Sequence, residues 1–113
     1  MIRLHDNLSL GNGYKVRLLL EQLGIPYERI EYDIDRGETR TPDFLNRINA
    51  NGRVPVLETE EDGFLPESNA IICYLAEGTP FFPQEPLERA RVLQWMFFEQ
   101  YRRFATHHRH LST

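Results

Sequence analysis

One passage, from Arg53 to Ile71, constrains the fold more than any other part of the chain. Residues 54–59 read as a strand that carries a proline near its start. Residues 60–63 form a hairpin turn with Asp-Gly chemistry, and residues 64–66 read as a short return strand. Apolar residues then recur at helical spacing over residues 68–77. The passage therefore predicts a strand, a tight hairpin and a helix in direct succession.

The residues before this passage predict a strand–helix–strand unit. Strands are expected at residues 2–6 and 27–34, with a turn-rich loop over residues 8–13 and a helix over residues 14–23 that Gly24 ends. Such a unit is expected to form a right-handed parallel crossover. After a polar loop, Thr41 caps a short helix that has Pro42 at its first position.

A linker with three prolines spans residues 78–86, and a long helix follows from residue 87 to about residue 104. The predicted fold class is α/β, in the order βαβ-α-ββα, with a mixed four-stranded sheet and helices on both of its faces. The expected domains are residues 1–79 and residues 80–113.

Composition restricts the function classes. The net charge of −4 argues against binding of nucleic acid through bulk electrostatics. No stretch approaches the length of a membrane span, and the N-terminus reads as a strand and not as a signal peptide. The single Cys73 cannot form an internal disulfide, which points to a reducing compartment. We therefore expect a cytoplasmic protein.

Val54-Pro55 is the first candidate for chemistry. The cis form of an X-Pro bond costs only about 0.5–1 kcal/mol over trans, so a folded domain can select it. A cis bond here would leave the Val54 backbone able to pair with an extended peptide ligand. The alternative is a proline at the start of a strand.

Glu67-Ser68 is the second candidate. The positive end of the following helix and the Ser68 hydroxyl suit a ligand carboxylate, and Glu67 suits an ammonium group. The pair therefore matches the amino-acid end of a γ-glutamyl group, although simple helix capping by Ser68 is the alternative.

The Gly11-Asn12-Gly13-Tyr14 turn is the third candidate. A helix N-terminus at this point could stabilise a thiolate, with a hydrogen bond from Asn12 or Ser9. The alternative is an ordinary tight turn.

In this order and spacing, the three pieces resemble the thioredoxin-like N-terminal domain of a bacterial glutathione S-transferase. The matching stretches are residues 11–20, 24–28, 51–57 and 65–71, and the similarity extends to about residue 101. The resemblance implies glutathione as co-substrate and no metal. It implies that the Val54 backbone beside Pro55 binds the peptide, and that Glu67 and Ser68 bind the γ-glutamyl group. The residues implied for the glycine carboxylate are Thr39, Arg40 and Arg53.

The sequence departs from the family at Leu10, where many relatives place a serine against the glutathione sulfur. The Asn-Gly pair resembles that of a subgroup with disulfide-bond reductase activity. We therefore expect Asn12 to donate the hydrogen bond to the thiolate, with Ser9 as the second candidate. The implied substrate is a small electrophile or disulfide.

Relatives continue into an all-helical domain that forms much of a homodimer interface. Only its first helix is expected here, as in a truncated chain, with weak activity and exposed apolar residues that favour self-association. A second hypothesis is a non-catalytic thioredoxin-like module with a binding or regulatory role, or an inactive product of truncation.

Two further candidates have less support. His107, His108 and His110 could bind a metal, but the alternative is that these histidines simply occur together in a frayed terminus. Cys73 could be a redox nucleophile, but the alternative is a buried, inert thiol.

Overall fold

The computed structural model describes the backbone of residues 1–111 and the side chains of residues 1–102. The chain divides into two compact units, Met1–Leu75 and a second that begins at Ala76. The first unit contains the sheet and the candidate site. No helix among the described residues has both the length and the apolar character needed to cross a membrane.

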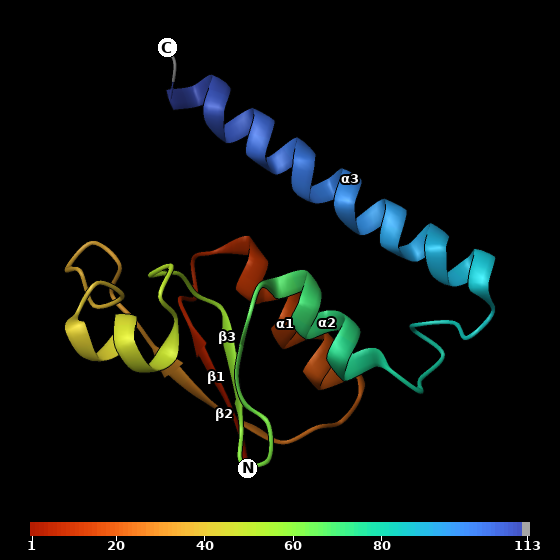
Figure 1. Cartoon of the computed structure of the whole chain (residues 1–113), viewed down its shortest axis with the longest axis horizontal. Coiled ribbons are helices and arrows are strands. Elements are labelled where there is room, and N and C mark those ends of the chain that lie inside the picture. Colours follow the sequence, from red (N-terminus) through yellow and green to blue (C-terminus); the bar gives the residue numbers. More distant parts are fainter. Residues whose placement is uncertain (112–113) are drawn as a thin grey trace. The chain divides into compact units, whose positions relative to one another are not determined.

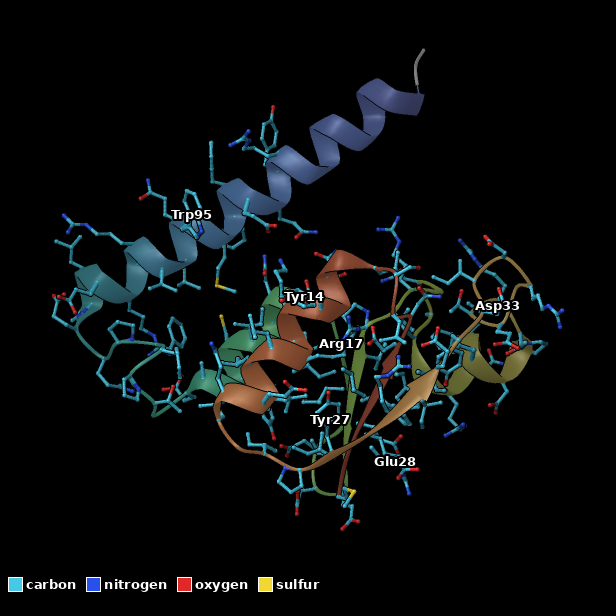
Figure 2. The ribbon with its side chains drawn as sticks, turned by 180° about the vertical axis from the view of Figure 1, so that it is seen from behind. Tyr14, Arg17, Tyr27, Glu28, Asp33 and Trp95 are labelled. Carbon is cyan, nitrogen blue, oxygen red and sulfur yellow. The ribbon has the colours of Figure 1, made fainter. Side chains whose placement is uncertain are left out.

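The first unit is a four-stranded mixed sheet in the order β2-β1-β3-β4. Strand β1 (Ile2–Asp6) runs parallel to β2 (Tyr27–Glu31) and antiparallel to β3 (Val56–Thr59), which pairs antiparallel with β4 (Gly63–Pro66). Figures 1 and 2 show the sheet between the π-helical turn η1 (Phe44–Ile48) on one side and α1 (Gly11–Gln22) with α2 (Ser68–Ala76) on the other. The predicted fold class is thus confirmed.

Alternation along the strands gives each face of the sheet its own core. One face holds a cluster of Phe44, Ile48, Val54 and Val56, against which Tyr32 and Phe64 pack. Leu4 and Leu57 are paired across β1 and β3 and lie on the opposite face, because neighbouring strand residues point in opposite directions. Both are fully buried, as are Val16 of α1 and Ile71 of α2.

Several element boundaries differ from those expected. Helix α1 begins at Gly11, three residues earlier than predicted, because the Leu10 carbonyl already accepts a hydrogen bond from Tyr14 N at 3.2 Å. Strand β2 ends at Glu31, because the chain then turns back and Gly37 N donates to the Ile34 carbonyl at 3.0 Å. Thr41 caps the next turn as predicted, with its hydroxyl accepting from Phe44 N at 3.1 Å.

In the second unit, α3 (Pro86–Leu111) is longer than the helix expected to end near residue 104. No glycine or proline occurs after Pro86 to stop it. The Glu85 carboxylate caps its start by accepting from Leu87 N at 3.1 Å and from Glu88 N at 2.8 Å.

Candidate functional site

Strand register brings the candidate residues to one end of the sheet. His5 is paired with Val56, and Val56 with Pro66. The end of β1, the start of β3 and the end of β4 therefore lie side by side, and parallel β2 ends there as well. The segments that leave this end carry every residue proposed from the sequence: Ser9, Asn12, Thr39, Arg40, Arg53, Val54, Pro55, Glu67 and Ser68.

Glu67 has a backbone conformation that non-glycine residues seldom adopt. Its φ is +78°, and its carbonyl accepts the first α2 hydrogen bond, from Ile71 N at 2.9 Å. Glu67 is thus the residue that precedes the helix, and Ser68 is its first residue. The alternative given for Ser68, that it is the N-cap, is therefore off by one position. Glu67 is exposed and Ser68 is buried, so the carboxylate reaches solvent beside the positive end of α2.

The Val54–Pro55 peptide bond is cis. Val54 and Pro55 lie outside the β1–β3 ladder, whose register ends at Val56, two residues later than the predicted start of this strand. Both residues are buried. The preceding turn is fixed by Asn49, whose amide donates to the Arg53 carbonyl at 3.1 Å and accepts from Asn51 N at 3.1 Å.

Two segments meet at Gly52. A Cβ atom at this position would lie 3.1 Å from Nε of Arg40 and 3.1 Å from the Thr39 carbonyl oxygen. The φ of Gly52, +66°, also favours glycine. The chain at residues 39–40 is therefore packed against the turn that leads to Arg53. Thr39 is buried, whereas Arg40 and Arg53 are exposed. Their guanidinium groups are accessible to an anion.

The two residues proposed to donate a hydrogen bond to the thiolate, Ser9 and Asn12, differ in their surroundings. The Ser9 hydroxyl donates to Asn7 Oδ1 at 2.5 Å, so its proton is already engaged. Asn12 lies in the first turn of α1, where its half-buried amide has an Oδ1 without a hydrogen-bond partner among the described residues. Leu10 precedes the helix and offers no side-chain cap.

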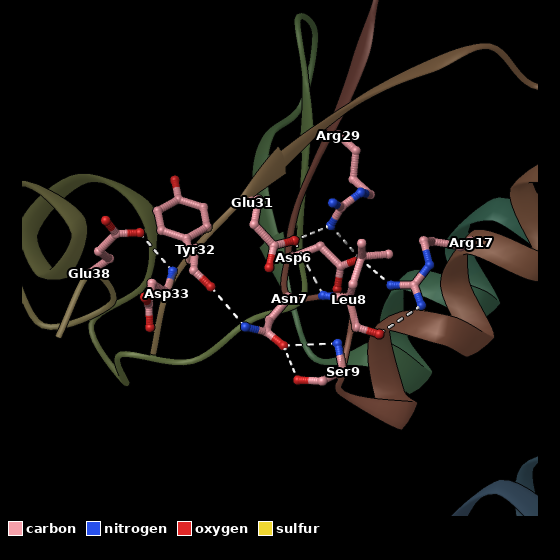
Figure 3. Close-up of polar contacts among 10 residues, drawn as sticks. All are labelled: Asp6, Asn7, Leu8, Ser9, Arg17, Arg29, Glu31, Tyr32, Asp33 and Glu38. Atoms are coloured by element: carbon pink, nitrogen blue, oxygen red, sulfur yellow. Dashed lines mark hydrogen bonds and ion pairs between the residues drawn. The ribbon is translucent and has the colours of Figure 1, made fainter. Parts of the chain in front are cut away.

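A buried carboxylate, which the sequence analysis missed, supports this first turn. Asp6 is fully buried at the end of β1 and pairs with Arg17 of α1 and, at 3.4 Å, with Arg29 of β2 (Figure 3). A side chain at Gly13 would collide with Asp6 Oδ1. Glycine therefore lets α1 approach the carboxylate. The signal in the sequence was an acidic residue at an inward position of a strand.

A second buried polar group lies on the opposite face of the sheet. His5, 3% exposed, contacts the Tyr32 hydroxyl at 2.7 Å and Glu58 Oε1 at 2.8 Å. The hydrogen bond with His5 lowers the pKa of Glu58 below its usual range, and burial raises the pKa of Tyr32. These contacts join β1, β3 and the segment after β2.

The described residues contain no cluster of three or more potential metal ligands. The side chains of His107, His108 and His110 lie outside the described residues.

The chain matches the family described as glutathione S-transferase, N-terminal domain, over residues 2–77. It is 40% identical over 95 residues to the disulfide-bond oxidoreductase YfcG of Escherichia coli K12, covering 78% of this chain and 44% of that protein. A possible glutathione S-transferase from Rhodopseudomonas palustris is 54% identical, with a TM-score of 0.82 over 88% of this chain and 48% of the other.

A glutathione transferase homologue from Sulfitobacter, solved with bound glutathione, is 30% identical, with a TM-score of 0.77 over 87% of this chain and 48% of the other. The chain thus spans a little under half the length of these relatives.

Proposed function

The chain belongs to the glutathione S-transferase family through its N-terminal domain, and on this premise we propose that it binds glutathione at the end of the sheet described above. The bound thiol is presented as a thiolate to a small electrophile or disulfide. The observation that carries the proposal is the convergence of four segments, one from each strand, on one end of the sheet.

Each end of glutathione has a chemically matched partner in this arrangement. Glu67 binds the γ-glutamyl ammonium group, and Ser68 with the N-terminus of α2 binds the adjacent carboxylate. The Val54 backbone, beside Pro55, pairs with the cysteinyl backbone of the peptide. Thr39, Arg40 and Arg53 hold the glycine carboxylate, which the exposed guanidinium groups favour.

Asn12 stabilises the thiolate together with the N-terminus of α1. Each unit by which the site lowers the thiol pKa corresponds to about 1.4 kcal/mol of preference for the thiolate. Ser9 is the weaker candidate, since its proton is engaged by Asn7. Resemblance to the disulfide-bond oxidoreductase YfcG favours a disulfide over an aryl halide as substrate.

We extend the proposal to the whole protein. Residues 1–79 form the glutathione-binding domain and residues 80–113 the start of a helical one. The protein is cytoplasmic, forms a homodimer and uses neither nucleic acid nor membrane as a partner.

A non-catalytic glutathione-binding module is the second candidate. Leu10 favours it, because this position before α1 offers no hydrogen-bond donor to a sulfur. The two candidates share the binding site and differ in whether the thiol is activated.

Calorimetric titration with glutathione tests the binding site in the full chain, with Glu67→Ala compared against Glu61→Ala, an exposed carboxylate in the β3–β4 turn. We expect saturable binding that Glu67→Ala abolishes and Glu61→Ala retains. No binding to the folded wild-type protein refutes the proposal. If the protein binds glutathione, turnover of a small disulfide is measured next. Turnover by wild type that is lost in Asn12→Ala favours the enzyme, and no turnover by wild type favours the binding module.

A further inference from the structure

The side chain of Asn7 connects two of the loops at the candidate site. Its Nδ2 donates to the Tyr32 carbonyl at 2.9 Å, just beyond the paired ends of β1 and β2. Its Oδ1 accepts from the backbone N of Ser9 at 3.0 Å and from the Ser9 hydroxyl at 2.5 Å. Figure 3 shows these contacts radiating from the amide of Asn7 to both sides. The amide therefore uses its donor on one loop and its acceptor on the other.

The segment after Tyr32 transmits this connection to residues 39–40. Asp33 N donates to Glu38 Oε1 at 2.6 Å, and Glu38 N donates to the Asp33 carbonyl at 3.1 Å, which closes a compact turn. Arg40 N then donates to the Gly37 carbonyl at 2.9 Å. A turn closed by hydrogen bonds thus lies between the Tyr32 carbonyl and Arg40.

The segment on the other side of Asn7 leads to Asn12. The Asn7 carbonyl accepts from Leu10 N at 3.1 Å, and Leu10 is the residue that precedes α1. Both the side chain and the backbone of Asn7 therefore fix the entry into the first turn of that helix.

We propose that Asn7 is a positioning residue that sets the thiol-binding turn at residues 9–12 against the carboxylate-binding segment at residues 33–40. This inference rests on the proposed function. Asparagine suits the role because its amide offers donors and an acceptor at once, whereas aspartate lacks the donor and alanine lacks both. In this proposal Asn7 acts through these two segments and not on the reacting sulfur.

The first test requires no ligand. Amide hydrogen exchange is measured in Asn7→Ala and Asn7→Asp, with substitutions of the exposed Asn46 of η1 to the same residues as controls. We expect Asn7→Ala to accelerate exchange in residues 9–12 and 33–40. Asn7→Asp keeps the acceptor for Ser9 and is expected to accelerate exchange in residues 33–40 alone. Exchange in residues 33–40 that matches the controls overturns the connection.

The second test separates positioning from general stability. Glutathione and γ-glutamylcysteine, which lacks the glycine carboxylate, are titrated into the same variants at a temperature where circular dichroism shows native protein. Loss of one hydrogen bond predicts glutathione binding about fivefold weaker in Asn7→Asp, with a smaller change for γ-glutamylcysteine. Equal losses for both ligands indicate a merely structural role and overturn the proposal.

Failure of the proposed function has a separate signature. Suppose that wild-type protein binds neither ligand while Asn7→Asp still changes exchange in residues 33–40. The connection that Asn7 makes between the two segments then stands, but the glutathione site and the proposal that Asn7 positions it are both refuted.

Discussion

At the scale of single residues, Glu67 combines a strained backbone with an exposed carboxylate. A residue with a side chain at a φ near +78° raises the free energy of the folded state, and such positions tend to occur at ligand sites. The strain follows from the Cβ atom and not from the carboxylate. The two contributions can therefore be separated by substitution.

Glu67→Gly and Glu67→Ala both remove the carboxylate, but only glycine relieves the backbone strain. We expect the unfolding free energy of Glu67→Gly to exceed that of Glu67→Ala by about 1 kcal/mol. Neither variant should retain glutathione binding. Urea unfolding and calorimetry measure the two effects, and equal stability of the variants would count against strain at this position.

The pairing of Asp6 with Arg17 makes a second prediction about a residue. Replacement of Arg17 by methionine leaves the buried carboxylate with the more distant Arg29. We expect a loss of about 2–3 kcal/mol in unfolding free energy, below the full cost of an unpaired buried charge. Arg36→Met serves as the control because Arg36 is 83% exposed. A loss no greater than that of the control would contradict a stabilising ion pair.

These residues also show how much of the candidate site could be predicted from the sequence. Glu67 and Asn12 could be selected because their types and spacing match a chemical task. The engagement of Ser9 by Asn7 could not, since it depends on how the chain turns between β1 and α1. Asp6 and His5 likewise gain their partners only when distant segments come together.

At the scale of elements, hydrophobic periodicity predicted the order of strands and helices, but hydrogen bonding set where each one ends. Strand β2 was expected to reach Ile34, because alternation continues past Glu31 in the sequence. The closed turn at residues 33–38 competes with the strand for the same backbone groups and ends it. Local pattern therefore predicts that an element exists better than it predicts its boundaries.

We expect the Glu58–His5 contact between β3 and β1 to make the sheet sensitive to acid. The pKa of Glu58 is lower in the folded state, so the contact stabilises the fold above the ordinary glutamate pKa of about 4.3 and is lost as pH falls through the lowered value. We expect Glu58→Gln to be less stable than wild type near neutral pH, with a difference that shrinks below about pH 4.3.

Urea unfolding at several pH values measures this difference, with Glu61→Gln in the exposed turn as the control. A difference between wild type and Glu58→Gln that stays constant down to the most acidic pH would show that the Glu58 carboxylate does not supply the stabilisation.

At the scale of the whole molecule, the two compact units differ in how they cover their apolar residues. The first unit buries a core of large side chains on both faces of the sheet, although a few, such as Ile34, stay exposed. The second exposes aromatic side chains along α3, with Trp95 66%, Phe97 73% and Tyr101 69% accessible. Exposed aromatic side chains of this number favour association.

We therefore expect a polypeptide of these 113 residues to self-associate as its concentration rises. Combined replacement of Trp95, Phe97 and Phe98 by serine should shift it toward the monomer, because each of these exposed side chains would otherwise gain from leaving water. Ile34→Ser, an exposed apolar residue of the first unit, is the control. Sedimentation velocity over a concentration series measures the effect. If the triple variant associates like wild type, α3 is not the contact surface; if the control also becomes monomeric, association lies with the first unit.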